Sequence, residues 1–142
     1  MMVKPTVQEL LTKAGIEFDT IPSQVEEIFN TNISVEEAVM DLAYQKAQWV
    51  ADKQSDDVLV IGADTIVVIN NEVLGKPKNP EDAIRMLSML ENNVHQVITG
   101  VTLIKGTTVK KFYEKTQVYF KHMSNNDILK YIEEENVYDK AG

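Results

Sequence analysis

The stretch VLVIGADTIVVIN, residues 58–70, raises the question on which the fold and the function of this chain both depend. Its β-branched residues favour an extended strand, yet Asp64 stands in the middle of the apolar run. A buried carboxylate without a partner is strongly destabilising. Asp64 must therefore be solvated at a cleft, paired with a cation, neutralised, or bonded to a neighbouring backbone amide as an ordinary strand-end residue.

The composition indicates the size of the fold and excludes several kinds of site. The chain has 142 residues, 44% of them hydrophobic, which predicts a single globular domain with a substantial core. It has no cysteine and only two histidines, so disulfides, thiolate metal sites and cysteine nucleophiles are excluded, and any metal would have oxygen ligands.

Charge and hydropathy narrow the expected partners and location. A net charge of −8 argues against a DNA or RNA polymer as partner, but not against a nucleotide that is carried with a divalent cation. No apolar run approaches the roughly 20 residues needed to cross a bilayer, and the N-terminus lacks a signal-peptide layout. We therefore expect a cytoplasmic protein that does not associate with membranes.

Helix and strand patterns alternate along the whole chain, which predicts an α/β fold. Helix-terminating and capping residues are expected at Gly15, at Ser34 with Glu37, at Asn79, and at Ser124 with Asp127. The predicted helices cover residues 6–14, 35–52, 80–90 and 125–135, and the helix over 80–90 is expected to turn Ala83, Ile84, Leu87 and Leu90 inward. The predicted strands cover residues 16–23, 58–69, 72–75, 94–104 and 107–123, with Asn70 and Asn71 as a hairpin turn.

Several polar residues in these elements allow both a structural and a chemical interpretation. Lys46 lies on the apolar stripe of its helix, either as a snorkelling stem or as a catalytic cation. Glu26 and Glu27 follow a predicted strand, where a solvated acidic edge is the alternative. Lys76 and Lys78 stand in the loop GKPKNP, which two prolines make stiff. His95 is interpreted as a structural residue that bonds backbone near a strand start.

Taken in order, these motifs resemble one known family. PSQVEE (22–27), AYQKA (43–47), VIGADTIVV (60–68), LGKPKNPEDAIRML (74–87), HQVITGV (95–101) and YDKAG (138–142) together resemble the Maf nucleoside triphosphate pyrophosphatases, which are associated with septum formation. The resemblance covers nearly all of the chain, and GADT favours the branch that acts on dTTP and UTP. It implies a mixed twisted sheet flanked by helices, with an active-site cleft of the kind found in Maf and inosine triphosphatase proteins.

The resemblance also implies a role for each site residue. Glu27 and Asp64 match the acidic positions of the family, which assigns Glu27 to Mg²⁺ or Mn²⁺ and Asp64 to metal binding or to activation of the attacking water. Lys46 and Lys76 match its phosphate-binding lysines, and Thr65 matches a position linked to selection of the base. A metal and two lysines would also explain how Asp64 stays ionised in an apolar strand.

Both ends depart from the family pattern. VKPTVQELL (3–11) stands where family members have a strand and a Ser-x-Ser-Pro-Arg-Arg loop, so Thr6 and Val7 replace an arginine pair that would bind phosphate. The family also continues beyond DKAG with further strands. We therefore expect a domain truncated at both ends, with impaired turnover and an exposed sheet edge. The edge predicts either a homodimer that covers it or a marginally stable monomer that aggregates on mild heating. The alternative is a non-catalytic remnant that binds nucleotide weakly or serves as an interaction module.

Overall fold

The computed structural model describes residues 7–75 and 77–134, with the backbone alone described at 134. The chain divides into two compact units, each of which is built from two separate stretches. Of the described residues, 7–63 and 101–112 form the first unit, and 64–100 and 113–134 form the second. The fold class is α/β, as predicted.

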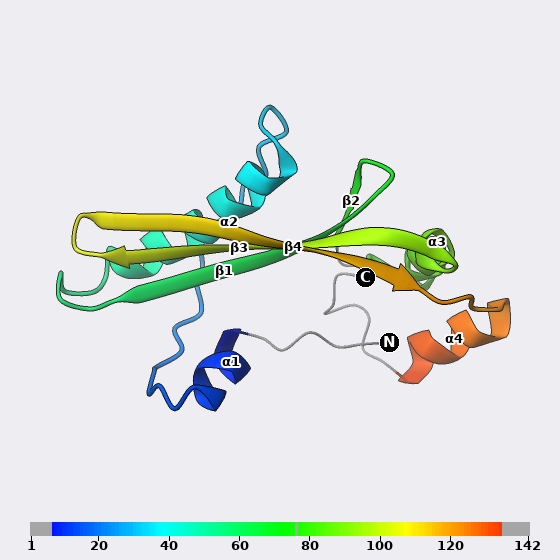
Figure 1. Ribbon diagram of the computed structural model, residues 1–142, viewed down its shortest axis with the longest axis horizontal. Helices are drawn as coiled ribbons and strands as arrows, with labels where there is room; N and C mark the ends of the chain where they lie inside the picture. The colour runs from blue at the N-terminus through cyan, green and yellow to red at the C-terminus, as the bar shows by residue number, and fades with distance from the viewer. Residues whose placement is uncertain (1–6, 76, 135–142) are drawn as a thin grey trace. The chain divides into compact units, whose positions relative to one another are not determined.

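The described strands form one sheet in the order β2-β1-β3-β4. They are β1 (Val60–Ile69), β2 (Glu72–Leu74), β3 (Asn93–Lys105) and β4 (Thr108–Phe120). β1 and β2 pair antiparallel through the predicted Asn70–Asn71 turn, in which both residues have positive φ (50° and 65°), as a two-residue hairpin of this kind requires. β3 and β4 run in opposite directions and meet at Gly106 (Figure 1).

The helices begin and end where the capping residues predict. Ser34 accepts the N–H of Glu37 at 3.1 Å, Asn79 accepts that of Asp82 at 2.7 Å, and Ser124 accepts that of Asp127 at 3.2 Å. Gly15, at φ +75°, ends the first helix in a Schellman arrangement, in which the N–H of Ile16 bonds the carbonyl of Leu11. The helices are α1 (Val7–Lys13), α2 (Val35–Ala51), α3 (Pro80–Leu90) and α4 (Asn125–Glu134).

In the first unit, α2 packs against the sheet through small residues. Ala47 of α2 forms an apolar cluster with Val60 of β1 and Ile104 of β3. A Cβ placed on Gly62 would lie only 2.6 Å from the carbonyl oxygen of Ala43 and 2.7 Å from the Cβ of Ala47. Gly62 is therefore a glycine because the backbone of α2 comes this close to β1.

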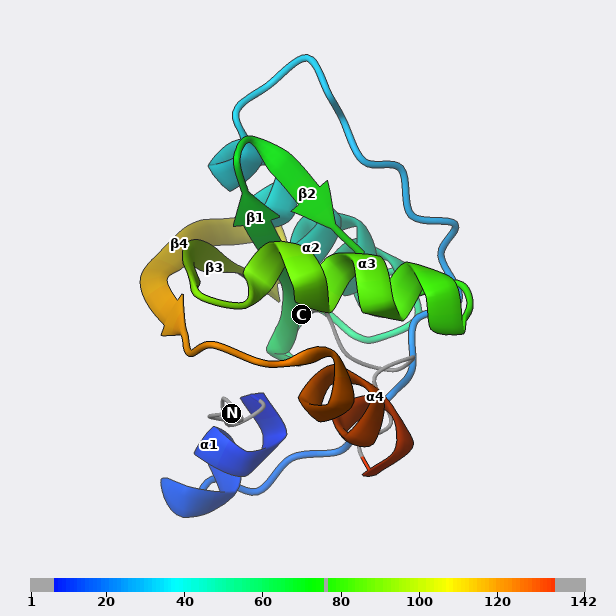
Figure 2. The ribbon, with the colours of Figure 1, turned by 90° about the vertical axis from the view of Figure 1, so that its right-hand side faces the viewer.

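In the second unit, α3 and α4 pack together beside the strands (Figure 2). The core of this unit is made by buried residues of both helices and of β1, β2 and β4: Val67, Ile69, Leu74, Met86, Leu87, Leu90, Phe120 and Ile128. The prediction that Ile84 points inward is wrong, because Ile84 is 36% exposed and Met86 is buried instead. Positions 83, 86, 87 and 90 follow the helical repeat, whereas 84 lies about 100° around the helix from 83.

The strand predicted over residues 16–23 is also wrong. This segment has no helix or strand, and Ile16, Phe18 and Ile21 are exposed. A strand needs a neighbour that takes up its backbone hydrogen bonds, and the segment pairs with none of the strands that the described residues form. An alternating apolar pattern alone does not supply that neighbour.

Among the described residues, none of the helices is long and apolar enough for a bilayer crossing.

Candidate active site

Two of the predicted site residues meet in the first unit. The Nζ of Lys46 on α2 lies 3.1 Å from Oε1 of Glu27, and both side chains are partly exposed, at 29% and 43%. Lys46 is held by the helical repeat among buried residues, with Leu42 one turn before it and Ala47 next to it. Lys46 is thus a half-buried lysine whose ammonium group has a carboxylate partner, and the pair presents one cation and one anion to solvent.

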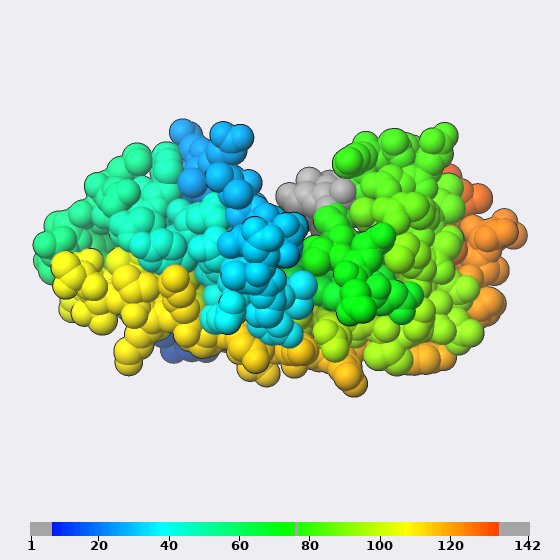
Figure 3. All heavy atoms as spheres, turned by 90° about the horizontal axis from the view of Figure 1, so that it is seen from above, coloured from blue at the N-terminus to red at the C-terminus, as the bar shows by residue number. Residues whose placement is uncertain are grey.

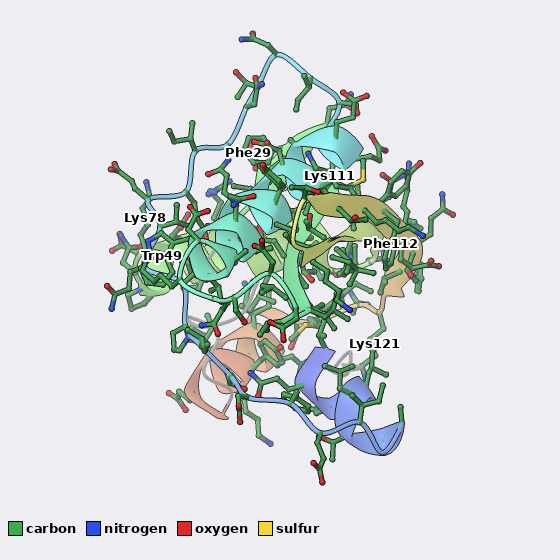
Figure 4. The ribbon with its side chains drawn as sticks, turned by 90° about the vertical axis from the view of Figure 1, so that its left-hand side faces the viewer. Phe29, Trp49, Lys78, Lys111, Phe112 and Lys121 are labelled. Carbon is green, nitrogen blue, oxygen red and sulfur yellow. The ribbon has the colours of Figure 1, made fainter. Side chains whose placement is uncertain are left out.

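A second lysine close to this part of α2 is engaged elsewhere. Lys111 of β4, labelled in Figure 4, has its Nζ 4.2 Å from the centre of the Tyr44 ring. A cation placed over an aromatic ring in this way is attracted to it. Lys111 therefore stabilises the contact between β4 and α2, and the sequence offers no reason to assign it a chemical role.

Asp64 and Thr65 lie in the middle of β1, in the second unit. β1 is buried at Val60 and Gly62 and again from Ile66 to Ile69, whereas Asp64 is half-buried and Thr65 exposed. Successive strand residues point to opposite faces, so the carboxylate and the hydroxyl leave β1 on different sides. The strand therefore does not bury Asp64 fully, and solvent reaches part of this side chain.

The hydroxyl of Thr65 has a partner that the sequence did not identify. It lies 2.9 Å from the hydroxyl of Thr99 on the neighbouring strand β3. Thr99 belongs to the HQVITGV motif, but only the pairing of β1 with β3 reveals which threonine it faces. One hydroxyl of such a pair donates and the other accepts, so Thr99 limits which hydrogen bonds Thr65 can still make.

Lys76 lies outside the described residues. The described part of its loop shows how the loop enters α3: the backbone N–H of Lys78 donates to Oδ2 of Asp82 at 3.0 Å. This hydrogen bond, together with Arg85, holds the pKa of Asp82 below its usual value. The loop is thus bonded to the first turn of the helix that follows it.

The predicted metal ligands do not form a ready-made cage. Among residues 7–75 and 77–134, no group of three or more acidic or histidine side chains is placed to hold a metal. Mg²⁺ commonly binds through one or two carboxylates, with water and substrate phosphates as its other ligands. The partly exposed carboxylate of Glu27 fits a hard cation that arrives with a triphosphate, and does not fit an all-protein site.

His95 has a structural place in the second unit. It is buried, with 5% exposed, and its ring lies 6.2 Å from that of Phe120 in the core. Burial lowers its pKa. Nδ1 of His95 is buried and has no hydrogen-bond partner, so the predicted bond to backbone is not made from this nitrogen. The ring occupies a core position beside Phe120.

A surface pocket of about 180 Å³ in the second unit does not fit a triphosphate. Its polar side chains include the amides of Asn70, Asn71, Gln96 and Gln117, and none of the described residues that line it is a lysine or arginine. Three phosphates carry several negative charges that need cations or a metal for binding. The pocket is therefore a poor candidate for the nucleotide site.

The comparisons with known proteins agree with the order of the motifs. A profile of the family described as Maf-like protein matches residues 5–142. The chain belongs to the Maf family. It is 45% identical over 140 residues to a protein of Alkaliphilus oremlandii named dTTP/UTP pyrophosphatase, with 97% of this chain and 72% of that protein covered.

Other relatives carry the same name. A protein of Caldicellulosiruptor bescii is 45% identical over 139 residues, which are 94% of this chain and 70% of that protein. One of Bacillus cereus is 43% identical over 138 residues, which are 97% of this chain and 72% of that protein. Both are named dTTP/UTP pyrophosphatase.

Proposed function

We propose that this chain hydrolyses dTTP and UTP to the nucleoside monophosphate and pyrophosphate. The observation that carries the proposal is the identity of 45% to a dTTP/UTP pyrophosphatase over 97% of the chain. The pairing of Glu27 with Lys46 at 3.1 Å supports it, because one carboxylate and one ammonium group suit a triphosphate that is carried with a divalent cation. The cytoplasmic location stays a prediction from the sequence.

The lysines stabilise negative charge on the phosphates. Lys46 gives up its contact with Glu27 and pairs with phosphate oxygens of the substrate. The resemblance to the Maf family gives Lys76 the same role. As ammonium groups they act as point charges, which are strongest where water is excluded. Their charge offsets that of the pyrophosphate as it leaves.

Asp64 takes part in the attack of water on the α-phosphorus. Its carboxylate accepts a proton as the water oxygen bonds to phosphorus, and the bond from phosphorus to the bridging oxygen breaks. That oxygen leaves with its electron pair on pyrophosphate. Glu27, with Asp64, would hold Mg²⁺ or Mn²⁺, which when bound neutralises phosphate charge and orients the phosphates.

Thr65 contributes to the choice of a pyrimidine base. Its hydroxyl is exposed and already engaged with Thr99, so it is held in one place instead of rotating freely. A fixed hydroxyl can match one pattern of donors and acceptors on a base and oppose another. We propose that this favours dTTP and UTP over ATP and GTP.

The test is a substrate panel with a matched pair of variants. Purified protein is incubated with dTTP, UTP, CTP, ATP and GTP and Mg²⁺, and the monophosphate and pyrophosphate are separated and measured. Asp64→Asn should abolish turnover, whereas Asp57→Asn, a change at an exposed carboxylate that accepts from Ser55, should leave it unchanged. EDTA should stop the reaction.

Three outcomes would contradict the proposal. Turnover of dTTP that is unaffected by EDTA would exclude the metal, and a preference for purine triphosphates would exclude the base assignment. Binding of dTTP without any release of pyrophosphate would favour the non-catalytic alternative, for which Thr6 and Val7 in place of the arginine pair are the motivating observation.

A further inference from the structure

Glu27 stands on a segment without helix or strand, in which residues 26–28 are exposed. Residues 16–30 form no helix or strand, and Figure 3 shows the atoms of this part of the chain, blue to cyan, on the surface. Ile28, the next residue, is 69% exposed. Val25 and Phe29 on either side are half-buried, but burial of side chains does not fix residues 26–28 themselves.

The side chain of Gln45 on α2 forms hydrogen bonds with both backbone groups of Ile28. Its Oε1 accepts the N–H of Ile28 at 3.0 Å, and its Nε2 donates to the carbonyl of Ile28 at 2.9 Å. The carboxamide thus pairs with Ile28 as a neighbouring strand would. Its position in the chain matters too, because Gln45 precedes Lys46 just as Glu27 precedes Ile28.

A third contact fixes the orientation of the carboxamide. Nε2 also donates to Oδ2 of Asp41, one turn earlier on α2, at 2.8 Å. A carboxylate oxygen and a backbone carbonyl both require a donor, so the NH₂ group must face them, and Oε1 is then left for the N–H of Ile28. All the donors and acceptors in this arrangement are complementary.

We propose that Gln45 is a positioning residue that holds the Glu27 segment against α2, so that the carboxylate of Glu27 stays beside Lys46. The Gln45–Ile28 and Glu27–Lys46 contacts join the same two pairs of consecutive residues. Without the bonds from Gln45 to Ile28, an ion pair between partly exposed groups has to keep Glu27 beside Lys46 without their help. Such exposed ion pairs hold a backbone weakly. The proposal rests on the proposed function only in giving Glu27 a metal to bind.

The test compares two changes of the same kind on one helix. Gln45→Glu keeps the acceptor for the N–H of Ile28 but replaces the donor to Ile28 and Asp41 by a second oxygen. Gln48→Glu is the control, since Gln48 stands three residues further along α2 and also donates to an aspartate four residues away, Asp52, at 2.6 Å. Gln45→Met, similar in length and uncharged, separates loss of the hydrogen bonds from the added charge.

Hydrogen exchange of the Ile28 amide is the direct readout. We expect it to speed up about tenfold in Gln45→Met, which is the factor for one lost hydrogen bond near the upper end of the usual range. The increase should be smaller in Gln45→Glu, which keeps the acceptor for this N–H but places a second oxygen against Asp41 and the carbonyl of Ile28. Gln48→Glu should leave it unchanged. Unchanged exchange at Ile28 in both Gln45 variants would overturn the proposal, and so would an equal increase in Gln48→Glu.

The catalytic consequence is measured separately. In Gln45→Met the Mg²⁺ concentration for half-maximal dTTP hydrolysis should rise about tenfold while kcat at saturating Mg²⁺ changes little, since the ligand is displaced and not removed. Faster exchange with an unchanged Mg²⁺ requirement would overturn the link to Glu27. The exchange measurement needs no turnover, so it decides the role of Gln45 even if the chain fails to hydrolyse dTTP.

Discussion

Replacing Gly62 by alanine tests whether the close approach of α2 to β1 positions the lysine of the proposed site. The added methyl group would lie 2.6 Å from the Ala43 carbonyl oxygen and 2.7 Å from the Ala47 Cβ, separations that such carbon atoms essentially never show. The nearest atom belongs to the helix backbone, so no side-chain rotation relieves the overlap. The turn of α2 from residue 43 to residue 47, which includes Gln45 and Lys46, has to move.

Two opposing terms decide the size of the effect. Overpacking of a tight contact costs about 1–3 kcal/mol. Alanine also restricts the unfolded chain, which stabilises by about 0.4–1 kcal/mol where the backbone accepts it, and Gly62 has no positive φ that would forbid it. The overlap should win, with a net loss of roughly 0.5–2 kcal/mol in the free energy of unfolding, or about 2 to 4 °C in Tm per kcal/mol for a chain near this length.

Gly75→Ala is the matched control, because an added Cβ there meets nothing within 4 Å. It should leave Tm unchanged or raise it slightly, whereas Gly62→Ala should lower Tm and also reduce kcat/KM for dTTP. Thermal unfolding followed by circular dichroism, with the dTTP assay on the same samples, gives both numbers. A Gly62→Ala protein that is as stable and as active as wild type would refute the reasoning.

Further predictions concern single contacts. Thr65→Val should reduce the preference for dTTP over ATP, and Thr99→Val should add nothing in the Thr65→Val background if Thr99 acts through Thr65; kcat/KM ratios over this double-mutant cycle measure it. Ser34→Ala should destabilise by about 1 kcal/mol through loss of the α2 cap, read from denaturant titration. Because burial lowers the pKa of His95, the unfolded state binds more protons, so stability should fall as pH drops below about 6.5, and His95→Phe should flatten this slope in pH-dependent melts.

The sequence predicted the elements whose ends carry their own signals. Ser34 and Asn79 fix helix starts by bonding an N–H three residues on, and Asn70 and Asn71 allow the tight turn between β1 and β2, so these boundaries depend on local chemistry. The strand predicted over residues 16–23 was wrong because a strand depends on a partner elsewhere in the chain. The inward position predicted for Ile84 was wrong because which apolar residue of a helix becomes buried depends on what packs against the helix.

The candidate site also contains residues that the sequence indicated and residues that only their distant partners reveal. The residue types and their order along the chain indicated Glu27, Lys46 and Asp64, and the structure brings Glu27 and Lys46 together. Gln45 and Thr99 were missed, because a carboxamide that bonds a distant backbone and a hydroxyl that faces another strand have no signature in the order of residues. Lys76 lies outside the described residues.

Gly62 and Asp64 stand two residues apart in β1, and what lies against the strand at each position explains the residue found there. Gly62 is buried because α2 lies against it, whereas Asp64, two residues further on the same side, is half-buried. A longer residue at 62 would push the helix away, whereas position 64 has room for a polar side chain that solvent partly reaches. Asp64→Asn keeps the size of the side chain and one acceptor oxygen, so it should abolish dTTP turnover with only a small change in Tm; a large loss of Tm in this variant would mean that the lost turnover reports on folding.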